Sequence, residues 1–201
     1  MEVFSSSNSS FSVVNHRLVG GGVSHLECPK NRRGLGVPDM IILHYTAGTN
    51  AESSAKFLVR PDVKASAHVV IGRDGQVIQL VPFNIEAWHA GKSSYRGRNE
   101  LNHYSIGIEL DNLGQLRLEG GKFVAECSRE VPVKEVYTED SGEEPTYWHD
   151  YTDVQMRVLN EVCSVLVDTY PIGDIVGHSD VTPRKVDPGP ALRVAEWIQY
   201  Y

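Results

Sequence analysis

The segment PDMIILHYTAG, residues 38–48, carries the clearest fold signal in the sequence. Residues 40–43 form an unbroken apolar run directly after a Pro-Asp pair. A short apolar run that follows turn-forming residues predicts a strand buried on both faces, as in the sheets of α/β proteins. His44 comes directly after the run, so we expect its imidazole at the end of a rigid strand.

Helix and turn signals follow this strand along the chain. The TNAE pattern at residues 49–52 resembles a capping box and predicts a short helix over residues 51–59, which Pro61 ends. Two β-rich runs farther on are joined by Asp74 and Gly75, and this pair predicts a hairpin because its turn requires positive φ angles.

The second half of the chain contains two further strands and the longest helix. The segments YSIGIEL at 104–110 and DIVG at 174–177 predict strands. Thr152 is the predicted N-cap of a helix whose apolar stripe comprises Val158, Leu159, Val162, Val165 and Leu166. A closing helix is expected over residues 191–198.

Strands and helices alternate without strict βαβ repetition, which predicts an α/β fold with a single domain and a central mixed β-sheet flanked by helices. Residues 1–37 are expected to form an irregular lead-in with a short strand near residues 17–19. The main domain is then 38–201, and its turn-rich, acidic stretch at 111–150 is expected to be an inserted hairpin and loop.

The net charge, the cysteines and the N-terminus of the sequence indicate which partners and which location to expect. Lys and Arg number 19 against 26 Asp and Glu, a net charge of −7, which argues against nucleic acid and against anionic membranes as partners. The cysteines Cys28, Cys127 and Cys163 are far apart and odd in number, so we expect free thiols. The N-terminus lacks the pattern of a signal peptide, and a cytoplasmic location is the expectation.

Two histidines directly follow apolar strands, and this placement suggests a metal site. His44 follows one strand and His178 follows another, while Asp187 lies in a proline-stiffened loop from which it can fold back. Zinc hydrolases commonly use three protein ligands and leave one position for water. From the residues alone, however, a histidine at a strand end is more often a hydrogen-bonded structural residue.

Three long segments resemble one enzyme family: IILHYTAG (41–48), SAHVVIGRDGQVIQLVPFNIEAWHAGKSSYRGRNELNHYSIGIEL (66–110) and VGHSDVTPRKVDPGPA (176–191). In this order they are similar to the zinc-dependent N-acetylmuramoyl-L-alanine amidases of the AmpD-like (amidase type 2) family, relatives of peptidoglycan recognition proteins and phage amidases. The resemblance covers residues 38–198. It implies a Zn²⁺ held by His44, His178 and Asp187, and hydrolysis of the bond between N-acetylmuramic acid and L-alanine.

The resemblance also implies two catalytic residues. Glu109 matches the family's general base, whereas from the residues alone it is a solvent-facing strand residue. Lys185 matches a lysine that stabilises negative charge on the reacting carbonyl, whereas from the residues alone it is a solvated loop charge.

A second group of residues is placed at a possible substrate groove: Tyr45, His68, Trp88, His89 and Asn102. Trp88 and His89 offer an aromatic face and a polar tip for sugar or peptide. Tyr45 is equally explained by packing, and His68 by support from within the core. Arg96 and Arg98 are further groove candidates that suit stem-peptide carboxylates, whereas His103 and His149 are expected on the surface.

The expected partner is peptidoglycan or a muropeptide, and the expected state is a monomer. Two biological roles remain open, namely recycling of wall fragments in the cytoplasm and phage-type lysis that delivers the enzyme to the wall. A non-catalytic peptidoglycan-binding module is the alternative from another functional class, but it conflicts with the presence of all three ligand positions and Glu109.

Overall fold

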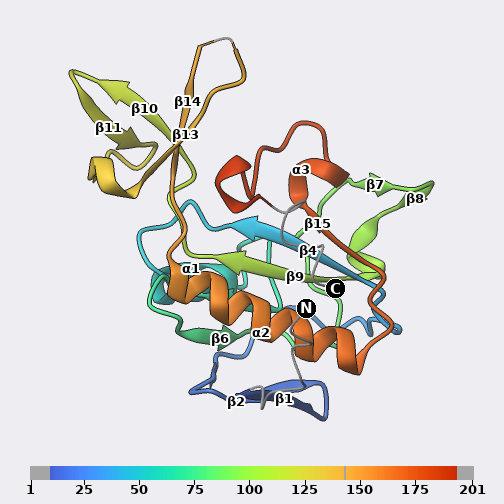
Figure 1. Cartoon of the computed structure of the whole chain (residues 1–201). Helices are drawn as coiled ribbons and strands as arrows, with labels where there is room; N and C mark the ends of the chain where they lie inside the picture. Colours follow the sequence, from blue (N-terminus) through green and yellow to red (C-terminus); the bar gives the residue numbers. More distant parts are fainter. Residues whose placement is uncertain (1–9, 143, 194–201) are drawn as a thin grey trace, which may run out of the picture.

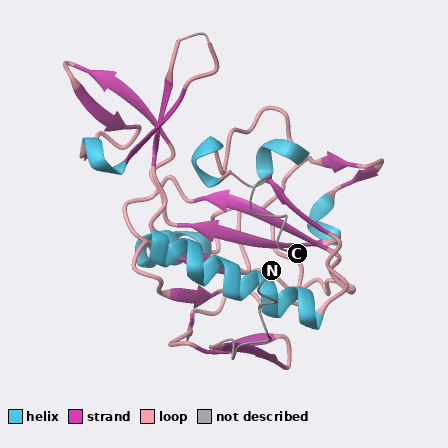
Figure 2. Cartoon of the chain, in the orientation of Figure 1, coloured by secondary structure: helices cyan, strands magenta, loops and turns pink. Residues whose placement is uncertain are grey.

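A computed structural model describes residues 10–142 and 144–193 of the chain. At its centre is a mixed sheet with helices on both faces (Figures 1 and 2). Across these residues the sheet has six strands, in the order β15 (Asp174–Gly177), β4 (Met40–Tyr45), β9 (Ser105–Leu110), β5 (Val69–Ile71), β6 (Val77–Gln79) and β3 (Ser24–His25).

The direction of the strands makes the sheet mixed. β15, β4, β9 and β5 run parallel to one another, whereas β6 is antiparallel to β5. The turn between β5 and β6 contains Gly75 with a φ of 87°, as the Asp-Gly signal predicted. The predicted α/β fold class with a central mixed sheet is therefore confirmed. Because four neighbouring strands are parallel, their carboxyl ends meet at one edge, where a site is best placed.

Both faces of the sheet are covered by apolar layers. Alternate residues of β4 and β9, such as Ile41 and Ile108, pack under helix α2 (Asp153–Thr169). On the opposite face, Val70 of β5 packs against helix α1 (Ala51–Leu58). A further cluster on this face includes Met40 and Ile42, which lie under the loop and turn residues of the segment 88–104. Burial on both faces explains the uninterrupted apolar sequence of the central strands.

The caps of the two helices can be compared with the prediction. Thr152 caps α2 by accepting a hydrogen bond from the backbone N–H of Gln155 at 3.1 Å, as predicted. For α1 the predicted cap was wrong by one residue, since Asn50 rather than Thr49 is the N-cap and accepts from the N–H of Ser53 at 2.8 Å. Asn50 has the extended backbone of an N-cap residue, and its carboxamide oxygen replaces the expected hydroxyl.

The N-terminal segment is more regular than the predicted lead-in. β1 (Phe11–Val14) and β2 (Arg17–Gly20) form an antiparallel hairpin, of which only the second strand was expected. Phe11 and Leu18 are buried in the same cluster as α2, so the hairpin belongs to the core. Short, mixed-polarity strands leave a weak periodic signal, and this is why serine-rich composition dominated the prediction.

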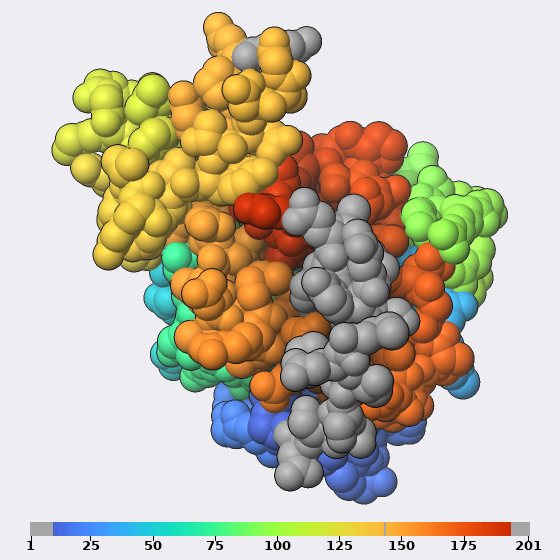
Figure 3. Space-filling model, viewed as in Figure 1, coloured from blue at the N-terminus to red at the C-terminus, as the bar shows by residue number. Residues whose placement is uncertain are grey.

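The insert forms its own small sheet and stands out from the body as a lobe (Figure 3). Within the described part of the insert the strand order is β12 (Glu130–Val131), β11 (Lys122–Ala125), β10 (Gln115–Glu119), β14 (Thr146–His149) and β13 (Val136–Glu139). The predicted hairpin is present between β10 and β11. The rest is sheet rather than loop, because a second cluster that includes Leu116 and Val131 gives it a core.

The remaining elements are short. β7 (Ser94–Tyr95) and β8 (Arg98–Asn99) form a small hairpin, and α3 (His178–Val181) follows β15 directly. The predicted helix over 191–198 falls mostly outside the described residues, and Pro190–Leu192 form a 3-10 turn. All three cysteines are free thiols. None of the helices in the described ranges is long and apolar enough to cross a membrane.

Candidate active site

Strand register brings the site residues together at one edge of the sheet. His44 on β4 is the register partner of Glu109 on β9, and partners on parallel strands point to the same face. On the other side of β4, Gly177 of β15 pairs with Leu43, so His178 lies beside His44. Two imidazoles and a carboxyl group therefore form a row across three neighbouring strands.

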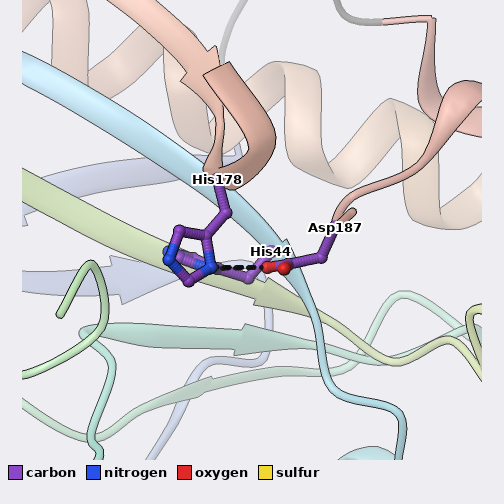
Figure 4. Close-up of side chains that lie close together, drawn as sticks. All are labelled: His44, His178 and Asp187. Atoms are coloured by element: carbon purple, nitrogen blue, oxygen red, sulfur yellow. Dashed lines mark hydrogen bonds and ion pairs between the residues drawn. The ribbon is translucent and has the colours of Figure 1, made fainter. Parts of the chain in front are cut away.

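The loop after α3 completes a cluster of three metal-binding groups (Figure 4). Oδ2 of Asp187 lies 3.0 Å from Nδ1 of His44 and 2.9 Å from Nδ1 of His178, and the two nitrogens are 3.1 Å apart. All three residues are buried, at 2%, 5% and 8% exposure for His44, His178 and Asp187. The structure therefore brings together the three side chains that the sequence suggested as ligands.

The contacts around the cluster are those of a group that could hold a metal ion. Nε2 of His178 faces the carbonyl oxygen of Ala90 at 3.3 Å, and a carbonyl can only accept, so this nitrogen carries the hydrogen. In the neutral ring the lone pair is then on Nδ1 and points at the carboxylate of Asp187. The two Nδ1 atoms and Oδ2 of Asp187 present lone pairs to one another, which repel. One proton can bridge only two of these atoms, whereas a divalent cation can accept a lone pair from all three.

The donor set fits zinc in both chemistry and size. Two nitrogens and one carboxylate oxygen are common zinc ligands, and ligand atoms around tetrahedral zinc lie roughly 3.3 Å apart. The observed triangle, with sides of 2.9–3.1 Å, needs only a slight expansion. Burial lowers the pKa of His44, which keeps it neutral.

The carboxyl group of Glu109, on the strand next to His44, has one unpaired oxygen. Its Oε2 is buried and has no hydrogen-bond partner among the described residues. Burial, together with the negative charge of Asp187, raises the pKa of Glu109 to about 8, while Lys185 opposes the shift. A carboxyl group that is desolvated and unsatisfied in a structured pocket is a candidate for acid–base chemistry.

A cavity of about 370 Å³ opens onto the cluster. Its walls include all three clustered residues, Glu109, Tyr45, Trp88 and Lys185. A second cavity of about 320 Å³, between β4, β9 and α1, shares Thr46 and Glu109 with the first. The two cavities therefore adjoin at Thr46 and Glu109, and we refer to them together as the groove.

Comparison with known proteins identifies the family. Residues 34–190 match the family described as N-acetylmuramoyl-L-alanine amidase. The chain belongs to this family. The resemblance seen in the sequence is thereby confirmed, and the clustered residues and Glu109 lie within the matched range.

Individual amidases support the assignment. The chain is 33% identical over 159 residues to the 1,6-anhydro-N-acetylmuramyl-L-alanine amidase AmpD of Escherichia coli, an alignment that covers 78% of this chain and 67% of that protein. It is 30% identical over 161 residues to the N-acetylmuramoyl-L-alanine amidase AmiD of the same bacterium, covering 75% of this chain and 49% of AmiD. The chain thus spans about two thirds or less of the length of these curated amidases.

Solved structures of amidases share the fold. A crystal structure of AmpD superposes with a TM-score of 0.63 at 26% identity and covers 93% of this chain and 97% of that chain. The complex of E. coli AmiD with anhydro-N-acetylmuramic acid-L-Ala-D-gamma-Glu-L-Lys superposes with a TM-score of 0.61 at 25% identity, covering 96% of this chain and 66% of that chain.

Of the predicted groove residues, Tyr45, Trp88 and His89 line the cavity of this amidase-family chain. Burial raises the pKa of Tyr45 to about 12. His68 is not at the groove, because its ring is fully buried and bonded to the carbonyl of Ile85 and the N–H of Gly107.

His89 lines the cavity as predicted, whereas Asn102 does not. His89 is largely buried, and its Nδ1 lies 3.0 Å from Nε2 of His44. The carboxamide oxygen of Asn102 accepts from the backbone N–H groups of His89 and Ala90. Both residues therefore support the site.

The four remaining candidates are also placed differently from the prediction. Arg96 pairs with Asp174 and Arg98 with Asp39, so neither guanidinium lines the groove. His149 is buried and accepts from the N–H of Leu113. His103 is half-buried, and its Nδ1 lies 2.6 Å from Oε2 of Glu86. Surface positions were expected for both histidines, and this was wrong for His149, whereas the side chain of His103 is 28% exposed.

Several groove residues had no signal in the sequence. Ser66 and Arg184 line the first cavity, and Ser53 and Phe57 on α1 line the second. Phe57 is 52% exposed although it belongs to an amphipathic helix. Its place at the cavity that Glu109 also lines depends on tertiary packing, which the sequence of the helix does not contain.

Proposed function

We propose that this chain is a zinc-dependent amidase that hydrolyses the bond between N-acetylmuramic acid and L-alanine in muropeptides. One observation carries the proposal. The metal-binding atoms of His44, His178 and Asp187 converge within 3.1 Å, and Glu109, whose carboxyl group has one unpaired oxygen, lies on the strand next to His44. Membership of the amidase family supports the same chemistry.

Zinc is the proposed cofactor, held by the two histidines and the aspartate with its remaining position open to the cavity. When bound, zinc lowers the pKa of water from about 15.7 toward ~7 and polarises the carbonyl of the substrate.

Glu109 is proposed as the general base and acid. It takes a proton from the attacking water and returns it to the amine nitrogen that leaves, so the scissile C–N bond breaks with the proton balance closed. This kind of transfer contributes about 10²–10⁴-fold to a rate. Glu109 must be ionised to accept the proton, and the positive charge of Lys185 favours that state by lowering its pKa.

Lys185 is proposed to stabilise the oxyanion that develops on the carbonyl. Its side chain is exposed at the cavity wall, where the ammonium group can approach a bound substrate without first breaking a buried ion pair. Removal of one oxyanion donor typically costs about 10²–10³-fold in kcat.

The groove is suited to an elongated, acidic substrate. The scissile bond has to lie at Glu109, so the sugar and the peptide extend into the two cavities that meet there. Arg184 and Lys185 add positive charge to one wall, and Trp88 offers an aromatic face. AmiD has been solved with an anhydro-muropeptide that contains γ-linked Glu, and we propose the same substrate class here.

Soluble muropeptides are the proposed natural substrate, in line with the 1,6-anhydro-N-acetylmuramyl-L-alanine activity named for AmpD. A monomer suffices, because one chain supplies the ligands, the base and the groove. An enzyme for phage-type lysis would instead hydrolyse intact cell wall with a higher kcat/KM than soluble muropeptides. We therefore expect a higher kcat/KM on anhydro-muropeptides than on sacculi, and the reverse order would favour the lysin role.

The decisive experiment is mass spectrometry of products from an anhydro-muropeptide incubated with the zinc-loaded protein. We expect free stem peptide, no release after chelation, and recovery with zinc. Glu109→Gln should lower the rate at least 10²-fold, whereas the control Glu126→Gln, which changes an exposed carboxylate on the insert, should not. Binding of the muropeptide without release of peptide would instead support a recognition module.

A further inference from the structure

A row of buried hydrogen bonds leads from a metal-binding histidine into the core. Nε2 of His44 lies 3.0 Å from Nδ1 of His89, and Nε2 of His89 lies 3.3 Å from Oγ of Ser105. Ser105 in turn donates to the carbonyl oxygen of Leu101 at 2.7 Å. The three side chains are at most 8% exposed, so water does not compete for these bonds.

The last hydrogen bond of the row determines which atom donates and which accepts in each of the others. A carbonyl oxygen only accepts, so the hydroxyl hydrogen of Ser105 is committed to Leu101, and its oxygen accepts from Nε2–H of His89. A neutral imidazole carries a single hydrogen, and in His89 this hydrogen is on Nε2, so Nδ1 accepts from Nε2 of His44. His44 must then donate from Nε2, and its Nδ1 presents a lone pair to the cluster.

The same segment orients the second histidine. Ala90 directly follows His89, and its carbonyl oxygen faces Nε2 of His178 at 3.3 Å. The backbone of both residues is held by Asn102, whose Oδ1 accepts from the N–H of His89 at 3.1 Å and of Ala90 at 2.8 Å. One dipeptide therefore contacts the outer nitrogens of both metal-binding imidazoles.

Strand β9 is shaped to receive the ring of His89. A Cβ atom at Gly107 would lie 2.3–2.6 Å from three atoms of that ring, which is closer than real contacts allow. Glycine at this position lets the imidazole lie directly against the strand. Ser105 is two residues earlier on the same face, which is why its hydroxyl reaches the far side of the ring.

We propose that His89 and Ser105 are positioning residues that lock His44 in the Nε2–H tautomer, while the carbonyl of Ala90 does the same for His178. This inference rests on the proposed metal centre but concerns how its ligands are prepared. Supporting groups at metal-binding histidines are often carboxylates. Here they are neutral, so Asp187 supplies the only negative charge among these groups, and a bound divalent cation keeps a net positive charge.

The lock has a direct spectroscopic test. In metal-free protein at pH 8, two-bond ¹⁵N–¹H correlation spectra of the histidine rings should show His44 with its hydrogen on Nε2. Observation of the Nδ1–H form in the wild-type protein would overturn the proposal. This measurement does not depend on catalysis, so it remains informative even if muropeptides prove not to be substrates.

A matched pair of serine variants provides the second test. Ser105→Ala should give a mixture of His44 tautomers and weaken zinc binding about 10–100-fold in competition with a chelating dye. Ser93→Ala removes a buried hydroxyl that also bonds Leu101, through its N–H, but does not touch His89, and should change the zinc Kd less than twofold. Equal zinc affinity of Ser105→Ala and wild type would refute the lock. If Ser105→Ala does not fold, the wild-type spectrum decides alone.

Discussion

Glu109→Gln should change how the stability of the metal-free protein depends on pH. The carboxyl group of Glu109 has a pKa of about 8 in the folded chain, against 4.5 when unperturbed, because of burial first and Asp187 second. Between these values the folded protein retains a proton that the unfolded chain has lost. Folding is therefore favoured less as the pH rises through this window, opposite to a carboxylate in an ion pair.

The size of the effect follows from the shift. Each pH unit within the window changes the unfolding free energy by about 1.4 kcal/mol. Between pH 5 and 7 the wild type should lose about 2–3 kcal/mol relative to Glu109→Gln, which has no proton to lose. The comparison with the variant is needed because buried histidines such as His44 and His68, whose pKa values burial lowers, change stability in the opposite direction over the same range.

Urea denaturation at pH 5, 6 and 7 measures this difference, with the exposed Glu126→Gln variant as control. Saturating zinc should shrink the pH dependence, because a nearby cation favours the ionised carboxyl group. A constant difference between wild type and Glu109→Gln across this range would refute the reasoning. It would mean that the carboxyl group is hydrated in solution and that its unpaired, buried oxygen is not a feature of the dissolved protein.

Four further outcomes are expected. Lys30→Met should lower the unfolding free energy in urea by about 2 kcal/mol, because Nζ of Lys30 contacts four backbone carbonyl oxygens at 2.7–2.9 Å; an unchanged midpoint would contradict this. Gly107→Ala should weaken zinc binding at least tenfold by displacing His89, and equal affinity in a dye competition would argue against that contact. Lys185→Met should lower kcat roughly 10²-fold in steady-state assays with little change in KM, and a change confined to KM would assign it to binding. Zinc at 1,000 times its Kd should stabilise the apoprotein by about 4 kcal/mol in calorimetry, whereas an unchanged Tm would exclude a folded-state site.

The central strands could be predicted because their signal is local. The apolar run at 40–43 is buried on both faces, as expected, and Asp74-Gly75 forms the predicted turn. Thr152 caps α2, whose predicted stripe faces the core together with Cys163. In each case one short segment contains both the hydrophobic pattern of the element and the turn or capping residues that bound it.

The N-terminal hairpin and most of the insert could not be predicted in the same way. Their strands are short, and Phe11 and Leu18 become core residues only through contacts with α2 far along the chain. The insert owes its order to apolar residues that are scattered among charges, such as Leu116 and Val131. Hydrophobic periodicity over two to five residues does not distinguish such strands from loops.

The candidate site divides along the same line. His44, His178 and Asp187 were identified from strand ends and from the family resemblance, and they converge. His89 was predicted at the groove because an imidazole beside a tryptophan suggests substrate contact, and it does line the cavity. Its contacts with His44 and Ser105, 45 and 16 residues away in sequence, could not be predicted, because no local pattern contains them.

Register links the stability of this fold to its chemistry. His44 and Glu109 are partners across β4 and β9, and His178 follows the residue that pairs with Leu43. A slip of one residue in either pairing would turn one of these groups to the opposite face, under α2, and would remove either a ligand or the base. The same slip would also place alternate core residues such as Ile41 on the wrong face. The apolar layers on both sides of the sheet therefore fix the relative positions of ligands and base, and the loop with Asp187 has only to reach a point that the strands already define.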